Sequence, residues 1–185
     1  MRNSHRRAHA QRTVPAREVY DRAAADIAAH LEVGRDVVVL CEGDPFFYGS
    51  FMYLFERLYP EYTCEIVPGV SSLTACAALL GRPLAARNDH FAVIPASLDE
   101  ATFREKLAAC DAAAIIKVGR HLPKVRRIVE ELGVTDRVGY IARVTLEHQV
   151  AQHLLDVADD EALYFSIVLI YKGDEPWNLA PQSSS

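Results

Sequence analysis

Short aliphatic runs recur along the chain, and amphipathic or small-residue stretches separate them. Residues 37–41 (VVVLC) form the first run, and residues 112–118 and 164–171 form later ones. A continuous aliphatic run is typical of a strand that is buried on both faces of a parallel sheet. Strands that alternate with helices favour such a sheet with right-handed crossovers. The pattern therefore predicts an α/β protein.

The periodicity of apolar residues predicts the other elements. Tyr20, Ala24, Ile27 and Leu31 recur at helical spacing between Pro15 and Gly34, which places a helix there. The remaining helices are predicted over residues 49–59, 71–80, 99–109, 121–132 and 147–156. The remaining strands are predicted over residues 63–67, 91–95 and 137–144.

The loop at residues 81–88 has neither the helical nor the strand period, and it predicts a linker between two α/β domains. The first domain is predicted over residues 18–84 and the second over residues 85–178, with a tail at 179–185. Residues 1–17 carry five arginines and no acid, and they are predicted to form a disordered basic leader.

Charge and cysteine content exclude several classes of function. The net charge of −5 and a pI near 5.8 give no global attraction to nucleic acid or to an anionic membrane. No apolar stretch reaches the roughly 18 residues of a bilayer span, and no signal peptide is visible, so a cytoplasmic location is predicted. The four cysteines form no CxxC pair, which predicts reduced core thiols and no metal site.

Three predicted strands end in unusual turns, at residues 42–45, 68–72 and 117–121. Ligands of open α/β sheets bind beyond the carboxyl ends of strands, so these turns predict one shared pocket. Glycines let the backbone approach a ligand, and a helix that starts at Ser71 or Ser72 offers free N–H groups to a carboxylate. Asp44 can face an ammonium or a sulfonium. Together these groups suit an amino-acid-like zwitterion better than a phosphate.

Each feature also has a purely structural interpretation. The Pro68-Gly69 pair can be a plain turn, and the two serines a plain helix cap. Phe46, Phe47 and Tyr48 can be core, and Arg120 with His121 can cap the next helix. Other ligand classes lack their signatures, because the chain has no GxxxxGK[ST], GxGxxG or GxSxG motif.

Three motifs together resemble the tetrapyrrole methylases of corrin biosynthesis: GDPFFYGSF, VPGVSSLTACAALLGRPLAARND and IIKVGRHLPKVRRI. The long second motif resembles the subgroup that methylates precorrin-2 at C-20. The likeness extends over residues 18–178. It implies two α/β domains with a cleft between them, S-adenosylmethionine as methyl donor, a tetrapyrrole substrate and a homodimer.

The resemblance also implies site residues. Donor contacts fall on Glu42, Gly43, Asp44, Phe47, Ser71, Ser72, Val118 and Val144. The substrate is a polycarboxylate, and its contacts are expected at Arg82, Arg87, Arg120 and His121, with Lys117 and Lys124 nearby. No residue is singled out as catalytic. His121, Asp44 and Glu42 are conceivable bases.

The sequence departs from this family at its start. The family opens with a strand and a GxGPGD-type loop before the segment that corresponds to Val19, and the arginine-rich leader stands there instead. A first domain without that opening is the expectation. Two alternatives to catalysis at C-20 follow: a non-catalytic remnant that binds tetrapyrrole or a partner chain, or a methylase of another position specificity. Whether the substrate already carries cobalt leaves no signature in the sequence.

Overall fold

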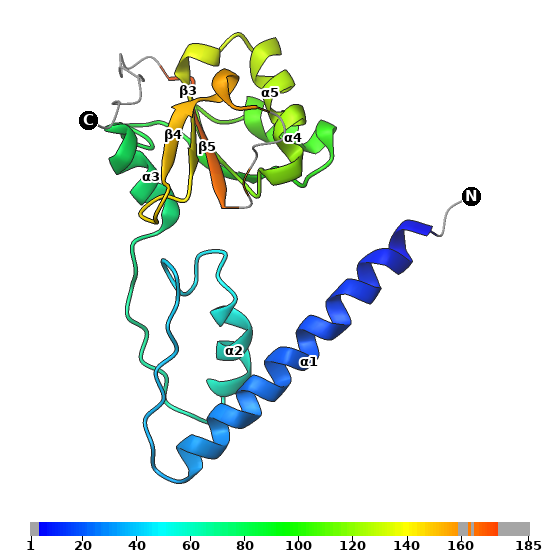
Figure 1. Cartoon of the computed structure of the whole chain (residues 1–185), viewed down its shortest axis with the longest axis vertical. Coiled ribbons are helices and arrows are strands. Elements are labelled where there is room, and N and C mark those ends of the chain that lie inside the picture. The colour runs from blue at the N-terminus through cyan, green and yellow to red at the C-terminus, as the bar shows by residue number, and fades with distance from the viewer. Residues whose placement is uncertain (1–3, 159–162, 164, 174–185) are drawn as a thin grey trace. The chain divides into compact units, whose positions relative to one another are not determined.

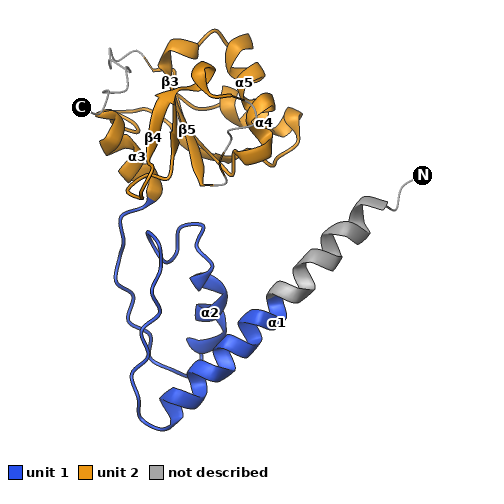
Figure 2. Cartoon of the chain, in the orientation of Figure 1, with its two compact units in different colours: residues 1–71 blue, residues 72–185 orange. Residues whose placement is uncertain are grey.

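The computed structural model describes residues 4–158, 163 and 165–173, with side chains from residue 17 onward. The chain forms two compact units, residues 1–71 and residues 72–185 (Figure 2). The sequence predicts a domain boundary after residue 84, whereas these units divide after residue 71, because the helix at 72–80 packs on the sheet of the second unit. The predicted tail at 179–185 lies outside the described residues.

Unit 1 contains two helices, α1 (Ser4–Glu32) and α2 (Phe51–Leu58) (Figure 1). The segment predicted to be a disordered leader is helical from Ser4 onward, continuous with the predicted helix that ends before Gly34. The two helices pack through the rings of Tyr20 and Tyr53, whose centroids lie 5.1 Å apart. Arg57 Nε also donates to Asp21 Oδ1 across the helix pair (2.6 Å).

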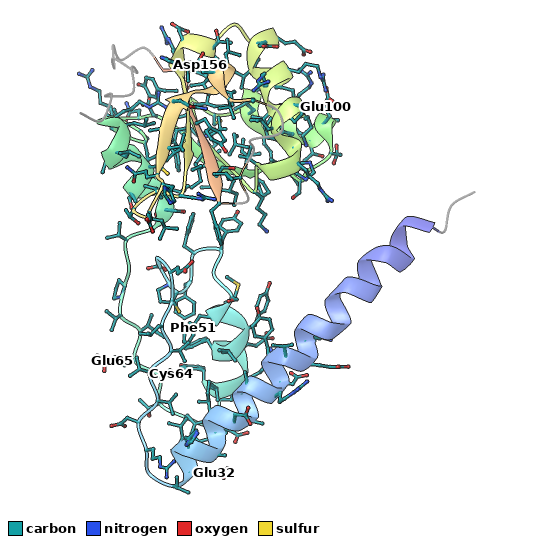
Figure 3. All side chains as sticks on the ribbon, in the orientation of Figure 1. Glu32, Phe51, Cys64, Glu65, Glu100 and Asp156 are labelled. Atoms are coloured by element: carbon teal, nitrogen blue, oxygen red, sulfur yellow. The ribbon has the colours of Figure 1, made fainter. Side chains whose placement is uncertain are left out.

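The two strands predicted in unit 1 are not formed. Residues 37–41 and 63–67 are extended, but among the described residues neither segment pairs with a strand. Val38 is 81% exposed and Leu40 is 91% exposed. Cys64, labelled in Figure 3, is half-buried and its neighbour Glu65 is exposed, as in a strand with one covered face. These two segments have the side-chain pattern of a strand, but no neighbouring strand among the described residues forms hydrogen bonds with them.

Unit 2 is built on one mixed five-stranded sheet in the order β1-β2-β5-β3-β4. The strands are β1 (Phe91–Pro95), β2 (Ala112–Ile116), β3 (Val138–Ala142), β4 (Val150–His153) and β5 (Ser166–Tyr171). β1 and β2 are parallel, and β5 is antiparallel to both β2 and β3. β2 and β3 therefore run in the same direction on either side of β5.

Helices cover both faces of this sheet. Two helices, α4 (Glu100–Ala108) and α5 (Leu122–Glu131), bury Phe103, Leu107 and Val125 in one core with Ile94 and Ile115 of the sheet. On the other face α3 (Ser72–Leu80) buries Leu73, Cys76 and Leu80 against a second core. Because both faces are covered, β2, β3 and β5 are buried at every position, as their continuous aliphatic runs predict.

Helix α3 lies very close to strand β3. A Cβ atom placed on Gly139 would lie 2.8 Å from Leu80 Cδ1, so this position accepts only glycine without repacking. This close packing explains why α3 belongs to unit 2. The structure corrects one further element, because residues 150–153 form strand β4 where a helix over 147–156 is predicted. The hairpin partner β3, which pairs Ala142 with Val150, decides the conformation of this short segment.

The four cysteines are free thiols in different environments. Cys76 and Cys110 are buried, as predicted, and burial raises the pKa of Cys76 to about 12. Cys41 is exposed and Cys64 half-buried, so for these two the predicted core location is wrong. Both lie in the extended segments of unit 1, where no described strand covers them.

Candidate functional site

Asp44 joins the two turns that the sequence singles out in unit 1. Its Oδ1 accepts a hydrogen bond from the backbone N–H of Phe46 (3.0 Å), which fixes the turn that follows residue 41. Its Oδ2 accepts from the backbone N–H of Gly69 (3.2 Å), which lies in the turn that follows residue 67. One carboxylate therefore holds two turns that are 25 residues apart in sequence.

The two turns are packed so closely that glycine is needed in both. A Cβ atom on Gly69 would lie 2.3 Å from the carbonyl oxygen of Gly43, a distance that no side chain tolerates. Gly43 itself has φ +83°, a left-handed conformation that favours glycine. The pair presents bare main chain beside a carboxylate, which is the arrangement that the sequence predicts for a close approach to a ligand.

The aromatic residues of the first turn have different surroundings. Phe46 is 44% exposed, and its ring lies 4.9 Å from that of Phe55 and 5.9 Å from that of Phe51, so it packs against α2 on one side. Phe47 is 37% exposed and makes an edge-on contact with Tyr48 (5.1 Å). Tyr48, which the structural interpretation of the sequence places in the core, is half exposed and has φ 54°.

Three further predicted donor contacts lie in the two turns of unit 1 and at the start of α3. Glu42 is exposed in the first turn, and Ser71 is half-buried at the end of the second turn. Ser72 is the first residue of α3 in unit 2. Its position agrees with the predicted helix start, where backbone N–H groups have no partner within the helix.

Val118 and Val144 lie at one edge of the unit 2 sheet, just after β2 and β3. Val118 is fully buried in the core, and its carbonyl accepts from the backbone N–H of His121 (2.7 Å). A ligand contact of Val118 would therefore run through its main chain and not through its side chain. Val144 is half-buried and packs against the core under α3.

Arg120 and His121 lie at this same edge, in the single 3₁₀ turn Gly119–His121 that leads into α5. Arg120 is exposed, and His121 is half-buried. Burial, and then the charges of Lys124 and Arg120, hold the pKa of His121 below its usual range. These effects favour the neutral imidazole over the imidazolium.

Arg82 does not lie where a substrate-binding arginine would. Its side chain is only 5% exposed, and its guanidinium donates to the carbonyls of Leu169 (2.9 Å) and Arg137 (3.1 Å). These hydrogen bonds give Arg82 a structural role, because they connect the loop after α3 to β5 and to the residue before β3. Arg87 is exposed in the loop before β1, in a left-handed conformation with φ 49°.

Sequence reasoning missed two features. The contact between Asp44 and Gly69 has no signal in the sequence, because it joins distant turns. Arg143 comes directly after β3, a position equivalent to that of Lys117 after β2, whereas the resemblance points only to its neighbour Val144. A basic residue directly after a predicted strand is the signal that points to it.

Two classes of site are not found in the part of the chain that the structure describes. No group of three or more His, Cys, Asp or Glu residues among residues 17–158, 163 and 165–173 is arranged to hold a metal ion. Among the described helices, none combines the length and apolar character needed to cross a membrane.

Comparisons with known proteins identify the family of the chain. The family model of Tetrapyrrole (Corrin/Porphyrin) Methylases matches residues 2–156. The chain is 43% identical to a precorrin-2 C(20)-methyltransferase from a Sinorhizobium species over 153 residues, which cover 83% of this chain and 62% of that protein. It is 31% identical to a cobalt-precorrin-2 C(20)-methyltransferase of Salmonella typhimurium, over 83% of this chain and 66% of that protein.

The fold is that of solved members of the same family. The crystal structure of the methyltransferase CobJ matches with a TM-score of 0.64 at 26% identity, over 82% of this chain and 70% of that one. The chain thus spans about three fifths of the length of the Sinorhizobium relative. From the motifs, the mixed α/β sheet and the match over residues 2–156, the chain belongs to the tetrapyrrole methylase family.

Proposed function

We propose that the chain takes part in methyl transfer from S-adenosylmethionine to C-20 of precorrin-2, or of its cobalt form, in corrin biosynthesis. The product would be precorrin-3A or its cobalt form. The observation that carries this proposal is the 43% identity to a precorrin-2 C(20)-methyltransferase over 83% of the chain. A homodimer, expected from the resemblance, is part of the proposal and is tested by the mass of the purified protein in solution. The cytoplasmic location expected from the sequence is also part of the proposal, and cell fractionation tests it.

The residues of unit 1 fit a zwitterionic and cationic ligand. Asp44 supplies negative charge at a point where Gly43 and Gly69 leave the main chain bare. Phe47 supplies an exposed apolar face on the same turn. Cations bind favourably to carboxylates and aromatic faces, so these residues suit the amino-acid part and the sulfonium of the donor.

In this reaction the main contribution of the protein is to bind and position the reactants. When bound, S-adenosylmethionine supplies an electrophilic methyl group, and no protein nucleophile is needed. The turns of unit 1 would bind the donor, and the strand ends of unit 2 would bind the tetrapyrrole. Binding and orientation of reactants can lower a barrier by roughly 7–11 kcal/mol. The neutral imidazole of His121 can accept a proton.

Calorimetric titration with S-adenosylhomocysteine tests the donor site directly. The expected result is one binding site per chain, with binding abolished in Asp44→Ala and retained in Asp26→Ala, which alters an exposed carboxylate on α1. Transfer of a labelled methyl group to precorrin-2, with the position assigned by carbon NMR, tests the reaction. A folded, monodisperse chain that binds no S-adenosylhomocysteine would refute the donor site.

A second function is favoured by one observation, the unpaired and exposed segments 37–41 and 63–67 of unit 1. Under this alternative the chain binds tetrapyrrole or a partner chain and performs no turnover. The two functions predict different results for the binding and methyl-transfer measurements. A chain that binds a porphyrin but neither binds S-adenosylhomocysteine nor transfers methyl would be the non-catalytic form.

A further inference from the structure

The strand directions of unit 2 bring the ends of β2 and β3 to one edge of the sheet. Both strands are antiparallel to β5, which lies between them. In the register of the sheet Ile115 and Tyr140 both pair with Val168, so Lys117 is level with Ala142 and Arg143 is one position further on. Two strand spacings separate the backbones of β2 and β3, about 10 Å.

The first residue after each of these strands is a cation in a strained conformation. Lys117 has φ 57° and Arg143 has φ 52°, both in the left-handed region that costs energy for any residue with a Cβ atom. Glycine would adopt this conformation without strain. Strained backbone of this kind gathers at functional sites, where the side chain is needed more than the relaxed backbone.

The loop after β3 is held in this conformation. The backbone N–H of Arg143 donates to the carbonyl of Phe165 (3.0 Å), and its own carbonyl accepts from Leu146 (2.9 Å). The side-chain oxygen of Gln149 accepts from the backbone N–H of Thr145 (2.7 Å). The half-buried Arg143 side chain is therefore carried by a loop with fixed geometry.

Positive charge collects at this edge. Arg120 and Arg143 make no side-chain hydrogen bond or ion pair within the described part of the chain, and Lys117 is exposed beside them. Lys124 Nζ donates to the carbonyls of Ala96 and Leu98, both at 2.6 Å, which places its charge just after β1 at the same edge. The lowered pKa of His121, which is due in part to these cations, agrees with a positive local potential.

The nearby acids are engaged elsewhere. Asp99 accepts from the backbone N–H and the hydroxyl of Thr102, as the N-cap of α4. Glu100 is paired with Arg104 and Arg127. Glu147, in the loop after β3, is highly exposed and lies 3.7 Å from His148. A chain with a net charge of −5 therefore keeps a local excess of positive charge at this edge.

We propose that Arg143, together with Arg120, binds the carboxylates of a polycarboxylate tetrapyrrole at the end of β2 and β3, with Lys117 adding charge. This inference rests on the proposed function, because it names the residues that would hold its substrate. Guanidinium groups bind carboxylates through two parallel hydrogen bonds, and the spacing of the strands lets two carboxylates be held at once.

The test uses the full chain and uroporphyrin III, a stable polycarboxylate tetrapyrrole, with the dissociation constant measured by absorbance titration. Arg143→Glu and Arg120→Glu are each expected to weaken binding by about tenfold or more, the loss of one charged hydrogen-bonded pair. Lys106→Glu makes the same charge change on the exposed last turn of α4 and should alter the constant by less than about twofold. Equal losses in Lys106→Glu and Arg143→Glu, or no loss in Arg143→Glu, would overturn the proposal.

Arg143→Gly separates binding from stability. Glycine relaxes the left-handed backbone, so this variant should unfold at the same temperature as the parent or higher, while its affinity for the porphyrin falls. A structural role for Arg143 would instead lower the unfolding temperature and leave the affinity unchanged.

The donor site is measured in the same samples. S-adenosylhomocysteine affinity should fall much less than porphyrin affinity in these variants, because the carboxylate proposed to face the donor, Asp44, lies in unit 1. Porphyrin binding without S-adenosylhomocysteine binding would refute the methyl-transfer function and keep the carboxylate site. Binding of S-adenosylhomocysteine without porphyrin binding would refute the carboxylate site alone.

Discussion

Gly69 illustrates how a single position can fix the geometry of unit 1. Its main chain lies against the carbonyl of Gly43, and its N–H donates to Asp44. The conformation of Gly69 is not left-handed, so the requirement for glycine is steric and comes entirely from this close approach.

Gly69→Ala should therefore separate the two turns. The added methyl group would lie 2.3 Å from the Gly43 oxygen, so the bond between Gly69 and Asp44 must break. We expect fast exchange of the amide of residue 69 and at least a tenfold loss of S-adenosylhomocysteine affinity, about 1.4 kcal/mol. Gly34→Ala is the control. Gly34 has φ +76°, but nothing lies near its Cβ position, so this variant should keep its affinity for S-adenosylhomocysteine. An unchanged amide exchange rate at residue 69 in Gly69→Ala would contradict the close packing.

Arg82 is predicted from the sequence to contact a ligand, but in the structure its side chain has a structural role. Burial lowers the pKa of Arg82 to about 10, so the guanidinium remains charged at neutral pH. Arg82→Met leaves the carbonyls of Arg137 and Leu169 without their donor. We expect a loss of about 2 kcal/mol in the free energy of unfolding, measured with urea. Lys106→Met, at an exposed site, should change it by less than about 0.5 kcal/mol.

At the scale of elements, α4 and α5 are joined by an ion-pair network on the surface of unit 2. Arg127 and Arg104 both bond to Glu100, labelled in Figure 3, and both also reach Glu131. Hydrogen bonds from Arg127 and then from Arg104 lower the pKa of Glu100 to about 2 from its usual 4.5. The pKa of Glu131 is also lowered, chiefly by Arg104.

This network predicts a pH dependence with a definite sign. Because the folded pKa of Glu100 is depressed, its contribution to stability is complete above about pH 4.5 and is lost as the pH falls toward 2. The wild type should therefore have a higher unfolding temperature than Glu100→Gln at pH 6, and the difference should shrink toward pH 2. Since the pairs are exposed, the difference at pH 6 should also shrink in high salt. A difference that grows on acidification would contradict this network.

The elements that the sequence predicts correctly are those whose partners lie within the described chain. Runs such as residues 112–116 become strands because helices cover both faces and a neighbouring strand pairs with each edge. Residues 37–41 carry the same pattern and remain unpaired, because an aliphatic run specifies burial and cannot supply a partner. The segment 150–153 shows the reverse, since pairing with β3 overrides its predicted helix.

The candidate site, like the strands, is predictable from the sequence only where the pattern is local. The turns at residues 42–45 and 68–72 are recognisable in the sequence from their glycine and proline residues, and the structure brings them together through Asp44. The burial of Arg82 could not be predicted, because the loop Gly81-Arg82-Pro83 has the composition of a surface connection and its acceptors lie 55 and 87 residues away.

At the scale of the whole molecule, the two units are built differently. Unit 2 has a sheet with a core on each face, whereas unit 1 leaves large aliphatic side chains exposed along residues 37–41 and at Val67 and Val70. Free energies of local opening follow buried apolar contacts and paired backbone groups. The two units should therefore differ in their protection from solvent.

Hydrogen exchange followed by mass spectrometry measures this difference. Amides of residues 37–41 and 63–67 should exchange close to the rate of an unfolded peptide, while those of β2 and β5 should be protected by about a thousandfold or more. Limited proteolysis should likewise cut first within residues 33–50 and 59–71 and leave a resistant fragment from unit 2. Protection of residues 37–41 equal to that of β2 would contradict the unpaired state of this segment. If that protection rises with protein concentration, a second copy of the chain supplies the missing partner, because only an intermolecular contact depends on concentration.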